Sequence, residues 1–265
     1  MTDKIQIDLT QPSQPVSVAL NEVDQRVSID ISQAGQRGIS SVTSQTTSDG
    51  TADLYVETIS FNTANGGPTD TGEISWMSTD GTLDLMLEND VVLAVGENGL
   101  IRIRNTSGDS ISKGDALVYT GTNGNTGRIN VAKWESSNVT DVKTFMGFAS
   151  GDMANNTNGY ATWFGKLDSI DTSGTDQGES WSDGDILYAL PGSPATLSTT
   201  APTHGAYASA AVIMRAHHVT GRLFARPAFH FAYGEFADDT AAASGGVAIG
   251  GIYRKSDGTV VWRQT

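Results

Sequence analysis

Five acidic side chains lie within the fifteen residues 171–185, which read DTSGTDQGESWSDGD. They are Asp171, Asp176, Glu179, Asp183 and Asp185, and Gly, Ser and Thr fill most of the positions between them. Carboxylates at this spacing could coordinate Ca²⁺, could act as a general acid–base pair, or could line a solvated turn between two strands. The surrounding sequence decides between these interpretations.

The calcium interpretation can be tested against the spacing of a known loop. An EF-hand loop beginning at Asp171 needs Gly at its sixth position and Glu at its twelfth, where Asp176 and Ser182 stand instead. The stretch is therefore no EF-hand. A calcium site of another type, formed by Asp183, Asp185 and a loop carbonyl, stays an alternative.

Other catalytic and metal-binding patterns have little support in the chain. GESWS places Ser182 where a nucleophile elbow needs its second Gly, and there is no Cys to act as a nucleophile. The adjacent His217 and His218 would point to opposite faces of a strand, so they cannot bind one ion together unless the strand is broken there. The glycine-rich GGVAIGG (245–251) lacks the Lys-Ser/Thr ending of a phosphate loop. We expect a non-enzymatic protein with no catalytic residue, cofactor or metal ligand.

Composition narrows the classes of partner. The 265-residue chain has a net charge of −14, which argues against binding to nucleic acid or to an anionic membrane. Its N-terminus, MTDKIQIDLT, contains no apolar signal-peptide core, and no apolar run approaches the roughly 20 residues of a membrane-spanning helix. We therefore expect neither nucleic acid nor membrane insertion among its interactions.

The five tryptophans are scattered, one to most of the apolar blocks, as core residues would be. Trp134 and Trp181 differ from the others because polar residues surround them. These two are the candidate surface recognition residues, and the alternatives for Trp181 are that it packs back into the sheet or contacts a neighbouring chain. Together with nearby Asp side chains they could form a groove that binds a sugar.

Residues 1–50 are predicted to form an extended N-terminal attachment arm and its linker. Apolar residues alternate with polar ones in three short segments, which predicts three strands with one apolar face. Three strands of this length cannot enclose a core, so the face must pack on the following domain, on neighbouring chains or on a larger particle. The candidate assembly residues are Ile5, Ile7, Leu9, Val16, Val18, Leu20, Val27, Ile29 and Ile31.

Short apolar segments separated by turn residues continue through the rest of the chain. ISWMS, TLDLML, VVLAV and LIRIR predict strands of a β-rich domain over 51–108. Residues 236–265 predict a closing cap: a short helix with Asp238 or Asp239 at its N-cap and Gly245 as its stop, followed by a hairpin that turns at KSDG (255–258).

The segment between these regions, 109–235, contains an internal repeat. GDALVY (114–119) and GDILYA (184–189) share Gly-Asp-x-Leu, and two further pairs of apolar segments follow in the same order: TFMGFA with AVIMRA, and NGYATWFGKL with TGRLFARPAF. This predicts two related β units, about 109–167 and 178–230. By the repeat, Asp185 corresponds to Asp115. We therefore expect Asp185 to be a turn residue that accepts hydrogen bonds from nearby backbone N–H groups.

The expected fold class is all-β, with short antiparallel strands in tandem β-sandwich or barrel-like units between the extended N-terminal arm and the helix–hairpin cap. The run ISWMSTDGTLDLMLENDVVLAVGENGLIRIRNTSGDSISKGDALVYTG (74–121) resembles a module of structural proteins of tailed bacteriophages. The resemblance continues in the same order to the C-terminus and covers about 73–265. It implies a homotrimeric tail-fibre, head-fibre or capsid-decoration protein, and it implies no catalytic residues.

The leading hypothesis is a trimeric fibre or spike protein on the virion surface, assembled in the host cytoplasm. Its expected partners are further copies of itself, other tail or capsid proteins, and a host surface glycan. A capsid decoration or cement protein is the close alternative. A carbohydrate-binding module and a calcium-stabilised adhesin are the other two hypotheses.

Overall fold

The structure is a computed structural model that describes residues 59–135, 139, 141–192 and 196–265. The chain divides into two units, Met1–Ser60 and Phe61–Thr265, and only the second is described below. The nine assembly residues predicted between Ile5 and Ile31 lie outside the described residues. The described part is all-β, as predicted, with one short α-helix and several 3-10 turns. None of its helices is long and apolar enough to cross a membrane.

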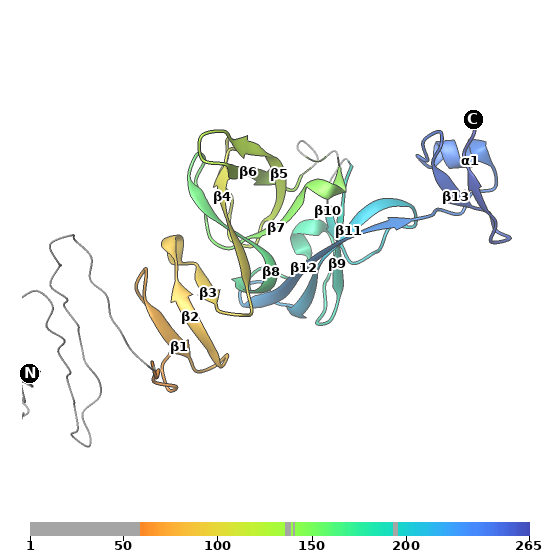
Figure 1. Cartoon of the computed structure of the whole chain (residues 1–265). Helices are drawn as coiled ribbons and strands as arrows, with labels where there is room; N and C mark the ends of the chain where they lie inside the picture. The colour runs from red at the N-terminus through yellow and green to blue at the C-terminus, as the bar shows by residue number, and fades with distance from the viewer. Residues whose placement is uncertain (1–58, 136–138, 140, 193–195) are drawn as a thin grey trace, which may run out of the picture. The chain divides into compact units, whose positions relative to one another are not determined.

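The first strands form a three-stranded antiparallel sheet at the start of this unit (Figure 1). They coincide with the predicted segments ISWMS, TLDLML and VVLAV, and a 3-10 turn, Glu88–Asp90, separates the last two. Their bounds are β1 Ile74–Met77, β2 Thr82–Met86 and β3 Val92–Ala94.

The next five strands close into a small barrel. Their order is β8-β4-β6-β5-β7, and a further pairing between β7 and β8 joins the two ends. The interior contains side chains such as Ile103, Leu117 and Val131, none of them exposed to solvent. The strands are β4 Gly99–Asn105, β5 Ala116–Asn123, β6 Arg128–Lys133, β7 Phe145–Ala149 and β8 Asn158–Ile170. β4 was predicted within the 51–108 domain, but its hydrogen bonds to β6 and β8 place it in the barrel.

Four more strands extend the same sheet from the far end of β8. Their order from the edge is β10-β9-β11-β12-β8, which matches the order β6-β5-β7-β8-β4 of the barrel strand for strand. In the barrel, β4 and β6 pair in parallel. The equivalent strands of the second sheet, β8 and β10, are not paired in the described structure, so that sheet stays open. The strands are β9 Ile186–Leu190, β10 Thr196–Ser198, β11 Gly205–Arg215 and β12 Gly221–Ala232.

Strand β8 belongs to both the barrel and the second sheet. Gly165 marks the point where its pairing changes from one to the other. Residues up to Phe164 pair with β4, and residues from Gly165 onward pair with β12. Gly165 has φ +110°, and a Cβ there would lie 2.6 Å from Asn98 Oδ1 and closer still to the carbonyl oxygen of Glu97. Only glycine combines this backbone conformation with so close an approach. The sequence repeat had suggested two separate units, and the shared strand is what joins them.

The two Gly-Asp turns of the repeat have the same hydrogen bonds. Asp115 Oδ2 accepts from the N–H of Ser112 at 2.8 Å, and Asp185 Oδ2 accepts from the N–H of Ser182 at 2.7 Å. Gly114 N–H donates to a carbonyl oxygen at the end of β7, that of Ala149. Gly184 N–H donates to a carbonyl oxygen of β11, that of Ile213. The predicted role of Asp185 as a turn residue is therefore confirmed.

The main hydrophobic core lies between the barrel and the second sheet and takes side chains from both. Trp134, Phe145 and Phe148 contribute from the barrel, with edge-to-face ring contacts at centroid distances of 5.3 and 5.7 Å. Leu187 and Ile213 contribute from the second unit. The barrel and the second sheet therefore share one hydrophobic core.

The C-terminal cap follows the prediction closely. The helix α1, Asp239–Ser244, has Asp238 as its N-cap, whose carboxylate accepts from Ala241 N–H at 2.8 Å, and it ends at Gly245. A hairpin of β13 (Ile252–Arg254) and β14 (Val260–Trp262) closes the chain.

Candidate functional site

Four of the five carboxylates of the 171–185 stretch accept hydrogen bonds from the loop itself or from neighbouring segments. Asp171 accepts from Ser173 N–H at 2.8 Å, and this bond holds the pKa of the Asp171 carboxyl below its usual range. Asp183 accepts from the N–H of Ala216 at 2.6 Å, at the end of β11. With Asp185 in its turn, these acids satisfy backbone donors and do not converge on one point. Across the described residues, no group of three or more His, Asp or Glu side chains is arranged to hold a metal ion.

Glu179 anchors this loop to strand β10. One carboxylate oxygen accepts from Ser198 Oγ at 2.5 Å, and the other accepts from Trp181 Nε1 at 2.8 Å and from Thr199 N–H and Oγ1 at 2.9 and 3.1 Å. Partial burial raises the pKa of Glu179, but the bonds from Ser198, Thr199 and Trp181 outweigh this effect and leave the pKa below its usual value. The charged form of Glu179 therefore fixes the loop.

The two tryptophans predicted as surface recognition residues are buried. Trp134 is 7% exposed and Trp181 is 9% exposed, and both belong to the main core. The predicted surface role is therefore wrong for both in this fold. Their polar sequence neighbours misled the prediction, because the residues that cover them come from other strands. Trp181 turns back into the sheet and packs on Gly174, where a Cβ would lie 2.7 Å from the indole.

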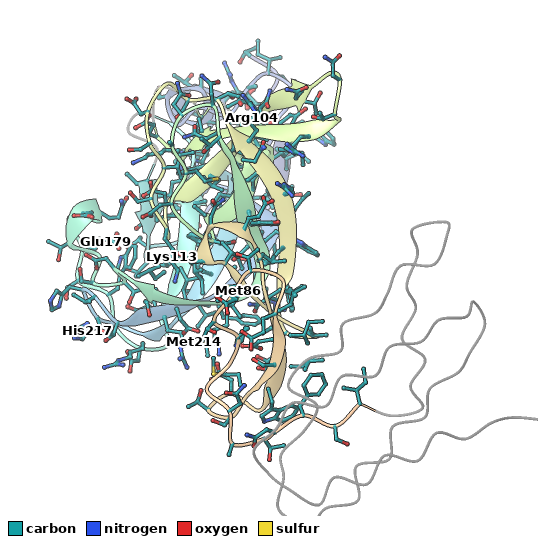
Figure 2. All side chains as sticks on the ribbon, turned by 90° about the vertical axis from the view of Figure 1, so that its left-hand side faces the viewer. Met86, Arg104, Lys113, Glu179, Met214 and His217 are labelled. Carbon is teal, nitrogen blue, oxygen red and sulfur yellow. The ribbon has the colours of Figure 1, made fainter. Side chains whose placement is uncertain are left out.

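A shallow pocket of about 350 Å³ lies beside this loop. Glu179 and Trp181 line this pocket together with His217 and His218. The two histidine rings stack at a centroid distance of 4.6 Å, so the expectation that they point to opposite faces of a strand is wrong, because β11 ends at Arg215. Figure 2 shows Glu179 and His217 on the same flank of the molecule. His217 Nδ1 accepts the N–H groups of Val219 and Thr220, both at 3.0 Å, so it already serves the local turn. The pocket is thus formed by groups that hold the loop together.

A second candidate surface is the end of the β11–β12 ribbon. Pairing of β12 with β8 covers only Gly221–Ala225, and the ribbon of β11 and β12 continues beyond it (Figure 1). A bulge at Arg226 and Pro227 marks the change, since Ala225 and Ala228 oppose Ala211 and Ser209. Pro lacks an N–H, and in sheets it is confined to edges and bulges. Past the bulge, the outer edge of β12 has no ladder partner in the described part of the chain.

One face of this ribbon presents a row of aromatic side chains, which we call the β12 aromatic row: Phe229, Phe231 and Tyr233. They are 53%, 55% and 51% exposed, and the rings of Phe231 and Tyr233 meet edge to face at 5.3 Å. Phe229 is directly opposite Ala208, which is fully buried in the core, so both lie on the same face of the sheet. The row therefore continues the core-facing side of the sheet past the end of the core.

The opposite face of the ribbon is built from polar aromatic groups. Tyr207 stacks on His230 at 5.1 Å and meets Tyr188 edge to face at 5.7 Å, while Ser209 Oγ lies 3.0 Å from His230 Nε2. This face has partners for its polar atoms within the chain. Within the described residues the β12 aromatic row has no comparable cover, and this contrast makes it the stronger candidate for contact with another molecule.

The β12 aromatic row is a feature that the sequence repeat hides. TGRLFARPAF matches NGYATWFGKL, and this match ends before the alternation of Phe229, Phe231 and Tyr233 continues past Pro227. The available signal was this period-two alternation beyond a proline, which is typical of an edge strand. Comparison with family models, with curated proteins and with solved structures finds no match for the chain.

Proposed function

We propose that this chain is a non-enzymatic structural protein of a tailed-phage virion, a homotrimeric surface protein of the fibre or spike type anchored by its N-terminal arm. The resemblance of residues 73–265 to phage structural modules supports the virion part of the proposal. The β12 aromatic row supports the assembly part, and it is the observation on which the proposal chiefly rests.

Exposure of this row is costly for an isolated chain. A Phe side chain has roughly 200 Å² of surface, so an exposed half corresponds to about 100 Å² and about 2.5 kcal/mol of unrealised burial. Phe229 and Phe231 together therefore represent about 5 kcal/mol per chain that a covering partner can recover. A second copy of the chain would meet an open strand edge and an apolar row at the same place.

A capsid decoration or head-fibre protein is the close alternative, because assembly through the same row would serve either location. The two differ in what the assembled protein binds. A decoration protein binds isolated capsids, whereas a fibre or spike protein co-purifies with tails and binds host cells.

The test is light scattering of the purified full chain, alone and mixed with phage capsids or tails. We expect the mass of a trimer for the wild type and the mass of a monomer for the double variant Phe229→Ser/Phe231→Ser. Ile74→Ser is the matched control, since Ile74 is 51% exposed but lies on β1. It should remain trimeric.

Two results would contradict the proposal. A wild-type chain that remains monomeric at high concentration and binds neither capsids nor tails has no assembly function. If the double Phe variant is still trimeric and its trimer dissociates as weakly as that of the wild type, the β12 aromatic row is not the interface.

A further inference from the structure

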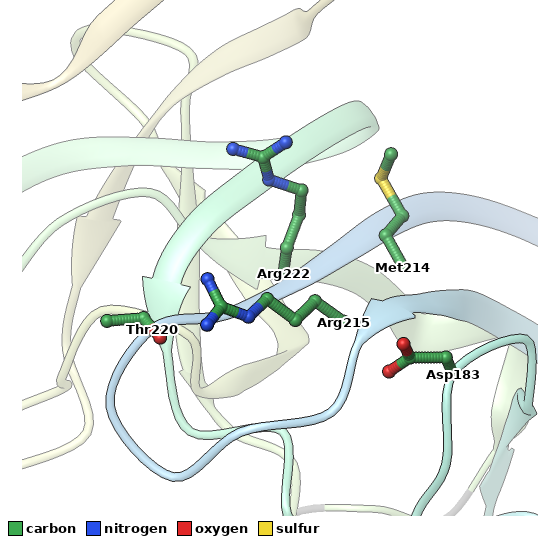
Figure 3. A pocket seen from close by; sticks show the side chains of 5 residues that line it. All are labelled: Asp183, Met214, Arg215, Thr220 and Arg222. Atoms are coloured by element: carbon green, nitrogen blue, oxygen red, sulfur yellow. The ribbon is translucent and has the colours of Figure 1, made fainter.

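Two arginines face each other across the β11–β12 ladder, at the opposite end from the aromatic row. Arg215 and Arg222 are direct partners in the register, so their side chains leave the same face of the sheet. They line a pocket of about 440 Å³ together with Asp183, Met214 and Thr220. Figure 3 shows the five side chains around this hollow, with Met214 and Asp183 across from the two guanidinium groups.

The guanidinium groups retain most of their hydrogen-bonding capacity. Arg222 forms an ion pair with Asp168 through Nε, which leaves its two terminal nitrogens for other partners. Within the described residues, no side-chain hydrogen bond or ion pair engages Arg215. Like charges directly opposite each other destabilise a sheet. An anion bound between the two guanidinium groups would relieve this repulsion.

The backbone around the pocket is held firmly. Thr172 Oγ1 donates to the carbonyl oxygen of Arg215 at 2.6 Å, and Asp183 Oδ1 accepts from Ala216 N–H at 2.6 Å. His217 Nδ1 fixes the turn that brings Thr220 to the rim. A site whose groups are already positioned loses little conformational entropy on binding.

The lining groups define the chemistry of the ligand. Asp168 already pairs with Arg222, so Arg215 is the lining cation that has no carboxylate partner within the described residues. One unpaired cation suits a singly charged group better than a doubly charged phosphate. Guanidinium forks match a carboxylate geometrically. Asp183 and Thr220 are suited to sugar hydroxyls, and Met214, which is 46% exposed, offers an apolar surface to the C–H face of a sugar ring.

We propose that this pocket binds a carboxylate-bearing sugar, such as a uronic or sialic acid residue of a cell-surface polysaccharide. Arg215 and Arg222 bind the carboxylate, and Asp183 accepts from a ring hydroxyl. The site is separate from the β12 aromatic row and does not depend on how the chain assembles.

The test is ligand-observed NMR of the full chain with trigalacturonate and sialyllactose. Lactose and fully methyl-esterified trigalacturonate are the uncharged counterparts, and inorganic phosphate is the simple anion. We expect both acidic sugars to bind and the uncharged ones to bind at least about tenfold more weakly, since a lost charge-assisted pair has this effect. Phosphate should compete poorly.

Arg215→Ala is the primary variant, because Arg215 has no ion pair to lose among the residues that the structure describes. It should weaken acidic-sugar binding by about tenfold, and Arg215→Lys should fall between it and the wild type. Arg226→Ala, an exposed β12 arginine outside the pocket, should bind like the wild type. The proposal is overturned if neither acidic sugar binds, if esterified or neutral sugars or phosphate bind equally well, or if Arg215→Ala leaves binding unchanged.

Discussion

Replacing Glu179 tests the structural role of its carboxylate in the acidic loop. Its carboxylate accepts four hydrogen bonds that join the 171–185 loop, Trp181 and strand β10. Glu179→Ala removes all four acceptor contacts at once. Trp181 is 9% exposed and Ser198 is 8% exposed, so water replaces the lost acceptors poorly at these two donors.

The magnitude follows from these two donors. A buried donor left without an acceptor costs about 1–3 kcal/mol, whereas the more accessible Thr199 groups can turn to water. We therefore expect Glu179→Ala to lower the free energy of unfolding by about 3 kcal/mol. Glu179→Gln keeps one oxygen for Trp181 and Thr199 and can donate its amide to Ser198 Oγ. We expect it to cost only about 1 kcal/mol, for the lost charge.

Chemical denaturation followed by circular dichroism measures these differences, and the indole N–H resonance of Trp181 reports on the local bond. Asp176→Ala is the matched control, because Asp176 lies in the same loop and its carboxylate has no hydrogen bond in the described structure. It should change stability by about 0.5 kcal/mol or less. Equal effects of all three variants, or an unshifted indole resonance in Glu179→Ala, would refute the reasoning.

The same carboxylate predicts a pH dependence. Because the pKa of Glu179 is lower in the folded chain than its ordinary value of 4.5, its stabilising contribution is fully present above 4.5. The contribution declines as the pH falls below that value and is lost once the pH passes the folded-state pKa. When the pH is lowered from neutral to below 4.5, the free energy of unfolding should therefore fall less for Glu179→Gln than for the wild type. A parallel loss in both would contradict the assignment.

Two further predictions concern the strand junction and the C-terminal cap. Gly165→Ala should destabilise the fold by about 2–4 kcal/mol in denaturation experiments, since it adds a clash to an unfavourable positive φ. Gly178→Ala, with φ +72° and nothing within 4 Å of its Cβ position, should cost only about 1 kcal/mol, and equal costs would argue against the clash. The hydrogen bond to Asp239 raises the pKa of Tyr253 to about 12, so Asp239→Asn should return it toward 10 in an absorbance titration. An unchanged titration curve would show that Asp239 is not the cause.

Local patterns predicted local structure well. The Gly-Asp pairs at 114–115 and 184–185 identified equivalent turns because an Asp side chain bonds backbone only two or three residues away. Asp238 and Gly245 similarly marked the ends of α1. In both cases the interactions that decide the structure lie within one short window of sequence.

Long-range contacts decided the features that the sequence did not reveal. Polar neighbours suggested that Trp134 and Trp181 were exposed, yet both belong to the core that the barrel and the second sheet share. The exposure of Phe229 depends on where β8 stops pairing with β12, and alternation alone does not show that point. Arg215 and Arg222 became neighbours only through the register of β11 with β12.

Strand β8 has a mechanical consequence that bears on the proposed role at a particle surface. A flexible linker between the barrel and the second sheet would let one half swing against the other, but these halves share a continuous strand and a common core. The ladder hydrogen bonds from β8 to β4 and β12 run across the strand. A force applied along β8 would therefore act on many of these bonds at once, in shear. The two halves should therefore transmit force as one stiff rod segment, with Gly165 as the fixed bend in it.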